Sequence, residues 1–529
     1  MAKAQKQSFI SGAAILALAV AVTKVLGAVY KIPLGNLLDK EGMAHFYVAY
    51  NIYSLLLILS TAGLPLALSR LVSRAHALGR ENQKRRVLGV ALAIFLAIGL
   101  VFGGAMFLFP QKLAALMHDT LAAAAIRALA PSVLCVCLIS AVRGYTQGQG
   151  NMKPTAVSQV IESGCKLAVG LTLAHVLLRS GHPSHEAAAG AIAGVTAGSV
   201  LSLAALGLYL LRSDGKRGTD IPQSRGEIAR DLLRIGVPVT IGAGSMSAIT
   251  LLDQMLTMAT LQNKLGLSEA AATALYGEYT FGMTLFNLPS SFIYPVTISL
   301  IPAIGAALAR GEREAARLQT ETAFRVTALL ALPAGIGLSV LSGPILNLLY
   351  PAVPETVAAA AYHLSVLGIA CIFVCLMVMT GGVLQAYGHE YIPVLSLLAG
   401  GAVKVAANYL LVADPAVGIR GAAVGTLCCY VLITLINLIA IHRLVPQRPD
   451  YFGVFFRPLL AAALMAVVAR GSWSLFDRLT GGSRLAVVAA VLLSMALYGM
   501  AVLSLGAIRR QDLLALPKGE KIADFLHIY

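Results

Sequence analysis

Apolar runs of about 20 residues or more recur along the whole chain, and they constrain its fold more than any other feature. A helix needs about 20 such residues to cross the roughly 30 Å hydrocarbon core of a bilayer. Only 12% of the 529 residues are charged, which is about half the share found in a soluble domain. The sequence therefore predicts an all-α polytopic membrane protein.

The apolar runs and the proline and glycine residues between them predict fourteen transmembrane helices. The first run follows a basic segment but is too long for a signal peptide, so we expect an uncleaved first span. The expected spans are residues 9–36, 43–69, 87–110, 120–146, 155–178, 187–211, 232–260, 271–303, 321–343, 356–385, 391–412, 421–442, 458–476 and 485–508.

Lysine and arginine residues fall mainly on one side of this arrangement. When the N-terminus is placed in the cytoplasm, most of them lie in cytoplasmic segments, as the positive-inside rule requires. The formal net charge of +16 is then explained by contacts with anionic membrane lipids, and not by nucleic acid. We therefore expect a multi-pass protein of the bacterial cytoplasmic membrane with both termini in the cytoplasm.

An internal repeat relates the two halves of the chain. Residues 144–168 align without gaps on residues 382–406, and GAIAG at 190–194 matches GAAVG at 421–425. Six spans separate the copies, so both have the same orientation, and the repeat is parallel, with a pseudo-two-fold axis along the membrane normal.

The repeat predicts two six-helix lobes plus two extra C-terminal helices. The expected parts are an N-lobe at 1–211, a cytoplasmic linker at 212–231, a C-lobe at 232–445, the extra helices at 446–508 and a cytoplasmic tail at 509–529.

Several charged residues lie inside the expected spans. A charge at the centre of a spanning helix costs about 2.5–3.5 kcal/mol on insertion scales, so such residues usually face a bundle interior or a watery cavity. The lysines predict a cationic cavity that binds an anionic headgroup, a pyrophosphate above all. They are Lys24, Lys31, Lys166 and Lys404, and the acidic and polar residues expected beside them are Glu162, Asp253, Glu278 and Asn408.

Each of these residues also has a structural alternative. Lys31 is close to the outer end of its span and would then extend to the interface. Glu162 and Lys166 are spaced i, i+4 and would form an ion pair within one helix. Lys404 would cap backbone carbonyl groups, and Asp253 is either a counter-ion for a lysine or a ligand of a coupling cation.

Five segments together resemble a known family. TKVLGAVYKIPLG, NIYSLLLILSTAGLPLALSRLVS, VRGYTQGQGNMKPTAVSQVIE, LYGEYTFGMTLFNLPSSF and SLIPAIGAALARGE occur in this order. They are similar to the stage V sporulation protein B and polysaccharide-biosynthesis branch of the multidrug/oligosaccharidyl-lipid/polysaccharide (MOP) flippase superfamily, which is related to MurJ-type lipid II flippases. The resemblance covers about residues 8–445.

The resemblance implies a flippase. Its substrate would be an undecaprenyl-pyrophosphate-linked sugar precursor, lipid II or a related peptidoglycan or polysaccharide intermediate, moved by alternating access. Lys24 matches the first of two arginines on helix 1 of the lipid II flippases. The sodium site of that family is matched most closely by Asp253, Asn408 and Thr426. We expect a monomer without a cofactor, with Na⁺ or H⁺ as the coupling ion.

Two other functions are weighed against this one. A cation-coupled multidrug exporter of the same superfamily predicts net acidic cavity residues and needs only twelve spans. A membrane enzyme needs a large loop that carries a nucleophile, metal ligands or a His–acid pair. The longest expected loop, at 212–231, carries none of these, so we do not expect an enzyme.

Overall fold

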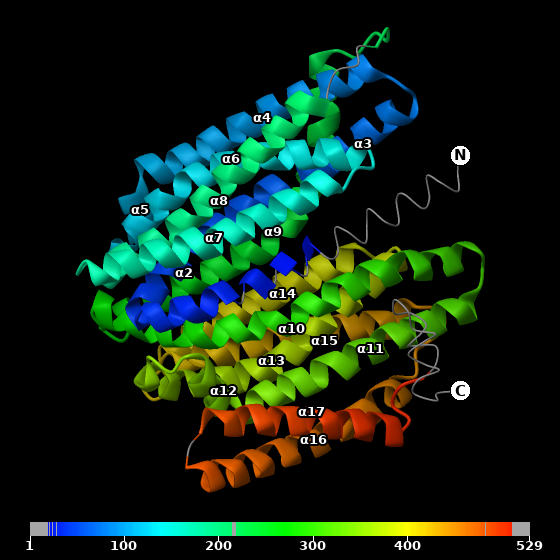
Figure 1. Cartoon of the computed structure of the whole chain (residues 1–529). Helices are drawn as coiled ribbons and strands as arrows, with labels where there is room; N and C mark the ends of the chain where they lie inside the picture. Colours follow the sequence, from blue (N-terminus) through cyan, green and yellow to red (C-terminus); the bar gives the residue numbers. More distant parts are fainter. Residues whose placement is uncertain are drawn as a thin grey trace. The chain divides into compact units, whose positions relative to one another are not determined.

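The computed structural model describes residues 19, 20, 22, 23, 25–27, 29–213, 218–481 and 483–509 (Figure 1). Every regular element in those residues is a helix, which confirms the predicted all-α fold there. The chain divides into two compact units, Met1–Gly277 and Glu278–Tyr529. The boundary between them lies inside helix α10.

The first unit consists of helices. Residues 29–37, which precede α2, are also helical. The labelled helices of this unit are α2 (Lys40–Thr61), α3 (Gly63–Ala77), α4 (Glu81–Leu108), α5 (Pro110–Leu116), η1 (Thr120–Ala122), α6 (Ala123–Gly148), α7 (Lys153–Arg179), α8 (Ser184–Ser213), α9 (Arg225–Asn263) and the first turns of α10 (Glu269–Ala309).

The second unit begins within α10 and ends with the two helices that the sequence predicts as additional. Its helices are the rest of α10, α11 (Arg313–Val340), α12 (Ser342–Leu349), α13 (Pro354–Ala386), α14 (Tyr391–Ala407), the π-helix η2 (Asn408–Val412), α15 (Arg420–Leu444), α16 (Tyr451–Thr480) and α17 (Arg484–Ser504). The last two helices pack against each other, and α16 also packs against α11.

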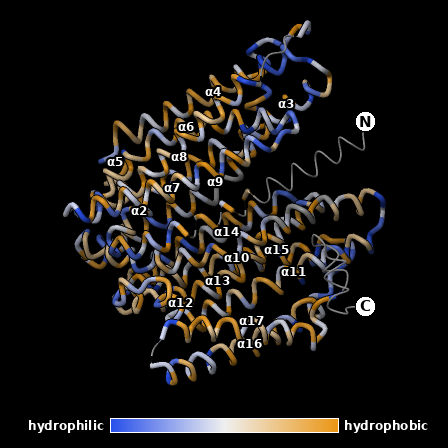
Figure 2. Tube along the Cα trace, viewed as in Figure 1, coloured by the Kyte–Doolittle hydropathy of each residue, from blue (hydrophilic) through white to orange (hydrophobic). Residues whose placement is uncertain are grey.

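Eleven helical segments in the described part of the chain are long and apolar enough to cross a membrane. Figure 2 shows hydrophobic residues along the helices and hydrophilic residues gathered at the helix ends and loops. Each of the eleven coincides with a predicted span, and α9 and α10 are long helices at two further predicted spans. Residues 9–18, 21, 24 and 28 of the first predicted span lie outside the described residues, so the count of fourteen stays a prediction.

The predicted second span is broken into α2 and α3 at Ala62, directly before Gly63. A Cβ atom at Gly63 would overlap the carbonyl oxygen of Gly236 on α9. The Gly63 N–H donates to Oγ1 of Thr240, also on α9, at 3.2 Å. The helix is therefore interrupted where its backbone meets the backbone of α9. The Gly63 N–H group donates to a side-chain hydroxyl instead of to a carbonyl of its own helix.

Glycines on one face of α8 hold this helix close to α7. Cβ atoms at Gly194 and Gly198 would lie 2.4 Å from Gly170 N and 2.6 Å from Glu162 O, respectively. Such a stripe of small residues is the usual way for membrane helices to approach closely, because van der Waals packing replaces the hydrophobic effect inside lipid. The GAIAG segment of the predicted repeat is thus a packing surface.

The two predicted copies of the repeat have the same packing pattern. In the first, α8 packs against both α6 and α7, and in the second, α15 packs against both α13 and α14. The repeat itself stays a prediction. The predicted C-lobe begins with α9, but in the structure α9 packs against α2, α3 and α4. The predicted lobe boundaries stay a prediction.

Candidate functional site

Two of the predicted lysines lie on the aromatic face of α2 in the first unit. The Nζ atom of Lys31 donates to the hydroxyl of Tyr47 at 3.1 Å and lies 4.7 Å from the centroid of that ring. The same atom lies 5.7 Å from the centroid of Tyr50. The Nζ atom of Lys166 on α7 lies 4.5 Å from the Tyr50 centroid and 4.9 Å from that of Tyr30. Both ammonium groups therefore share one tyrosine ring, Tyr50.

The sequence places these rings together through helical spacing. Tyr47 and Tyr50 are three residues apart on α2, and Phe46 stacks on Tyr50 with ring centroids 5.6 Å apart. Tyr30 is anchored by its hydroxyl, which donates to the carbonyl of Ala191 on α8 at 2.9 Å. The rings are thus held by packing and hydrogen bonds before any ligand arrives.

A third cation of the first unit has a different partner. Arg143 on α6 forms an ion pair with Glu162 on α7, with Nη2 and Oε2 3.1 Å apart. Its Nε atom also donates to Oγ of Ser158 at 2.8 Å. The structural alternative paired Glu162 with Lys166 on the same helix. In the structure Glu162 pairs instead with Arg143, which lies on the neighbouring helix α6.

The contacts of the three cations differ in one physical respect. A carboxylate neutralises its partner, whereas a tyrosine ring attracts an ammonium group through its quadrupole and leaves the positive charge in place. Arg143 is thus paired with Glu162, whereas the contacts of Lys31 and Lys166 are with tyrosine rings. We name the residues Tyr30, Lys31, Tyr47, Tyr50 and Lys166 the lysine–tyrosine cluster.

The predicted residues of α9 and α10 are placed as follows. Asp253 on α9 is buried in the first unit. Its neighbour Gln254 accepts a hydrogen bond from Asn51 on α2 at 2.6 Å. Glu278 on α10 is also buried, at the first position of the second unit.

Lys404 and Asn408 lie on consecutive helical segments of the second unit. Both are buried, and Lys404 lies in the last turn of α14, directly before the π-helix η2 that begins at Asn408. Short π-helical segments within helices occur often at functional sites. Asn408 reaches α15 at Gly425, where a Cβ atom would lie 2.7 Å from its Oδ1.

The residues predicted to bind sodium are distributed over both units. Thr426 on α15 donates to the carbonyl of Ala422 at 2.9 Å, and its hydroxyl lies 3.1 Å from that of Tyr279. Asp253 belongs to the first unit, and Asn408 and Thr426 to the second. Among the described residues, no group of three or more His, Cys, Asp or Glu side chains could hold a metal ion. The sodium site therefore stays a prediction.

Lys24 lies outside the described residues, so its place in the cavity stays a prediction too. The tyrosines and Arg143 are not among the predicted site residues. The available signals are the tyrosine spacing in FYVAYNIY at 46–53 and the place of Arg143 inside the predicted span 120–146. They were missed because tyrosine in a membrane helix is usually a packing residue.

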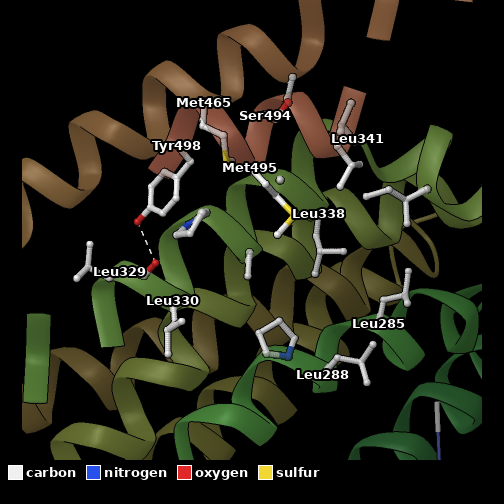
Figure 3. Close-up of a pocket in the computed structure, with 17 residues that line it drawn as sticks. Leu285, Leu288, Leu329, Leu330, Leu338, Leu341, Met465, Ser494, Met495 and Tyr498 are labelled. Atoms are coloured by element: carbon white, nitrogen blue, oxygen red, sulfur yellow. Dashed lines mark hydrogen bonds between the residues drawn. The ribbon is translucent and has the colours of Figure 1, made fainter. Parts of the chain in front are cut away.

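An apolar groove of about 510 Å³ lies in the second unit (Figure 3). Its walls come from α10, α11, α12, α16 and α17. The hydroxyl of Tyr498 donates to the carbonyl of Leu329 at 2.9 Å, and that of Ser494 to the carbonyl of Ala490 at 2.6 Å. Both hydroxyl groups of the lining donate to backbone carbonyls, so the groove offers an occupant mainly apolar surface. Such a surface suits a hydrocarbon chain.

Comparison with known proteins adds a family and a fold. The sequence profile of the family described as "Polysaccharide biosynthesis protein" matches residues 9–307. Stage V sporulation protein B of Bacillus subtilis (strain 168) is 27% identical over 452 residues, 83% of this chain and 85% of that protein. The lipid II flippase MurJ of the same organism is 26% identical over 455 residues, 82% of each chain.

Two solved structures have a similar fold. One is the lipid II flippase MurJ in an inward closed conformation, with a TM-score of 0.69 and 14% identity over 92% of this chain and 97% of that one. The other is an inward-facing multidrug resistance MATE family transporter of the MOP superfamily. Its TM-score is 0.63, with 16% identity over 85% of this chain and 98% of that one.

Proposed function

This chain belongs to the polysaccharide biosynthesis protein family, and from that premise we propose that it moves a lipid-linked sugar precursor across the membrane. It is a multi-pass membrane transporter of the MOP superfamily, related to MurJ, and not an enzyme. The proposed substrate is an undecaprenyl-pyrophosphate-linked saccharide, lipid II or a related intermediate. The proposed movement is alternating access in the bacterial cytoplasmic membrane, with both termini in the cytoplasm.

The lysine–tyrosine cluster is the observation that carries this proposal. Lys31 and Lys166 are held by tyrosine rings that do not neutralise them. Two ammonium groups around one ring match a pyrophosphate, which carries more than one negative charge along a short group. Ammonium groups on flexible stems also follow a moving anion, because they act as point charges without the fixed geometry of a guanidinium group.

The apolar groove of the second unit supports a substrate with a lipid part. A polyprenyl chain needs a surface without unsatisfied polar groups, and both hydroxyl groups of the groove donate to backbone carbonyls. The two helices beyond the predicted twelve, α16 and α17, supply one wall.

A cation-coupled multidrug exporter is less well supported. A site for cationic drugs needs uncompensated acidic groups, whereas Glu162 is paired with Arg143. The charge that remains in the cluster is positive and would repel such a ligand. Asp253 remains the candidate through which Na⁺ or H⁺ would be coupled.

Rescue of a bacterium depleted of its own lipid II flippase tests the proposal. The parent chain and the variants Lys31→Met, Lys166→Met and Lys153→Met are expressed at matched membrane levels. Lys153 is the matched control, since it is an exposed lysine at the start of the same helix, α7. We expect growth with the parent and with Lys153→Met, and loss of growth with the other two.

The outcomes separate the function from the site. Growth with all three variants would retain the transporter function and refute the role of the cluster. No growth with the well-expressed parent would refute lipid II as the substrate. Transport would then be measured with teichoic acid, capsule and spore-cortex precursors.

A further inference from the structure

A second basic site lies in the first unit, where α4 and α9 begin. It is a pocket of about 950 Å³ between the first turns of these two helices. Arg85 and Arg86 of α4 and Arg225 of α9 line it. No carboxylate occurs among the described residues that line it. Both helices also direct the positive ends of their dipoles toward this region, which adds to the attraction for an anion.

Three acidic residues near the pocket have defined partners. Glu81 forms an ion pair with Lys84 at 2.7 Å. Glu227 accepts a hydrogen bond from the backbone of Ser224 in the capping box of α9. Asp220 accepts the backbone N–H groups of Asn82 and Gln83. The carboxylates of Asp220 and Glu227 are thus directed to backbone N–H groups, and the charged side chains that line the pocket are all arginines.

The wall of the pocket is built by the loop before α9. Gln223 accepts from Nε2 of Gln83 at 2.7 Å, and its own N–H donates to Oε1 of Gln83 at 2.7 Å. Nη1 of Arg86 donates to the carbonyl of Gln223 at 3.3 Å. These bonds, with those of Asp220, fasten the loop to the first turn of α4. Arg86 is thus held by its bond to this loop.

The pocket changes from polar to apolar along α4. Beyond the arginines its lining is Gly89, Val90, Ala93 and Ile94, which lie at the start of a predicted membrane span. The polar part is then at the level of lipid headgroups and the apolar part at the level of the first acyl carbons. A free anion would use only the polar part, whereas a phospholipid would use both.

We propose that this pocket binds an anionic glycerophospholipid of the leaflet that the lysine and arginine distribution predicts to be cytoplasmic. The arginines bind the headgroup phosphate through charge-assisted hydrogen bonds, and one acyl chain follows the apolar face of α4. The bound lipid joins α4 to α9 beside the loop that leads out of α8. This inference is independent of the transported substrate.

Lipid titration of the purified full chain in a neutral detergent tests the inference. Dioleoyl phosphatidylglycerol is added, with dioleoyl phosphatidylcholine as the neutral lipid, and bound lipids are counted by native mass spectrometry. The variant Arg86→Gln/Arg225→Gln is expected to bind phosphatidylglycerol about 30-fold more weakly, from the usual contribution of a basic residue near an anionic lipid.

The control variant is Arg74→Gln/Arg230→Gln. It removes the same amount of positive charge, from two exposed arginines on the predicted cytoplasmic side. Arg230 is also on α9, and neither arginine lines the pocket. We expect it to bind like the parent. Equal weakening by both variants would refute a specific site, and so would unchanged binding by Arg86→Gln/Arg225→Gln.

A second variant tests the apolar part while all charges are kept. A Cβ atom at Gly89 or Gly104 of α4 has no neighbour within 4 Å, but only Gly89 lines the pocket. Gly89→Phe is therefore expected to weaken phosphatidylglycerol binding, and Gly104→Phe to leave it unchanged. Unaltered binding by Gly89→Phe, or full displacement of the lipid by inorganic phosphate, would overturn the lipid assignment in favour of a free anion site.

Discussion

The ammonium group of Lys166 lies 4.5 Å from the centroid of the Tyr50 ring, although the two residues are 116 positions apart in the chain. The acid one turn before Lys166 on the same helix, Glu162, is instead bound to Arg143. Tertiary packing thus separates a lysine from its local carboxylate and places it on an aromatic ring. An aromatic ring attracts an ammonium group without supplying a negative charge, which fits the anionic headgroup that we propose as the ligand.

Replacement of Tyr50 tests whether its ring holds both lysines in place for the ligand. Tyr50→Leu removes the quadrupole and should lower affinity for a polyprenyl-pyrophosphate saccharide about 5- to 30-fold, from about 1–2 kcal/mol of lost cation–π contacts. Tyr50→Phe retains the ring and should retain most of the affinity. Binding of the purified variants to the lipid checks both, and equal losses would show that the hydroxyl group matters instead.

Filling the apolar groove should impair transport without impairing the fold. Gly337 lines the groove, and the nearest atom to a Cβ there would be Cε of Met465 at 3.7 Å. Gly337→Phe should therefore place a ring in the space for the lipid chain. Gly471→Phe on α16 is the control, because a Cβ there has no neighbour within 4 Å and the residue is not in the groove.

Growth rescue at matched expression is the measurement for this pair. We expect rescue with Gly471→Phe and none with Gly337→Phe, while both variants elute as single species in size-exclusion chromatography. Full rescue by Gly337→Phe would remove the groove from the mechanism.

The packing of α7 on α8 predicts opposite effects for two glycines of α8. A Cβ at Gly194 would lie 2.4 Å from backbone N of Gly170, so Gly194→Ala forces the helices apart. Overpacking of this kind costs about 1–3 kcal/mol and sometimes more. A Cβ at Gly207 meets nothing within 4 Å, so Gly207→Ala should be neutral or gain up to about 1 kcal/mol of helix propensity.

Thermal unfolding in detergent, followed by intrinsic fluorescence, measures the two variants. A lower melting temperature for Gly194→Ala than for Gly207→Ala is expected. Similar values would mean that α8 can shift away from α7 at no cost.

Asp220 predicts a pH dependence of the loop between α8 and α9. Burial raises the pKa of its carboxyl group, but hydrogen bonds from the backbone N–H groups of Asn82 and Gln83 outweigh this effect and hold the pKa below its usual value. A depressed pKa in the folded state means that the carboxylate stabilises the fold above its unfolded pKa of 3.8. That stability is lost as the pH falls through the folded pKa.

Loss of the Asp220 hydrogen bonds should free this loop from α4. Limited proteolysis at residues 218–224, with an acid-active protease, measures this change. Between pH 5 and pH 3, taken roughly as one unit to either side of the unfolded pKa, cleavage of the parent should rise. Asp220→Asn should be cleaved more readily than the parent at pH 5, with little further change on acidification. A parent whose cleavage does not respond to pH would argue against the contact with α4.

The membrane class and most helices follow from the sequence because both depend on local chemistry. A run of about 20 apolar residues is stable in a bilayer only as a helix whose backbone groups bond within the segment. The glycine and proline of the segment TAGLP at 61–65 allow a bend inside the predicted second span. The close approach of α9, which causes that break, had no local signal.

The cluster required the tertiary structure because its partners are far apart in the chain. The sequence determined that Lys31 and Lys166 lie inside predicted spans. A charge there is unfavourable in free energy, so such residues usually have a function. Only packing decided which groups Lys166 meets, since Tyr30 and Tyr50 come from other helices and Glu162 pairs with Arg143. Charge and hydropathy can be read from the sequence, but whether a buried charge is neutralised depends on which helices become neighbours.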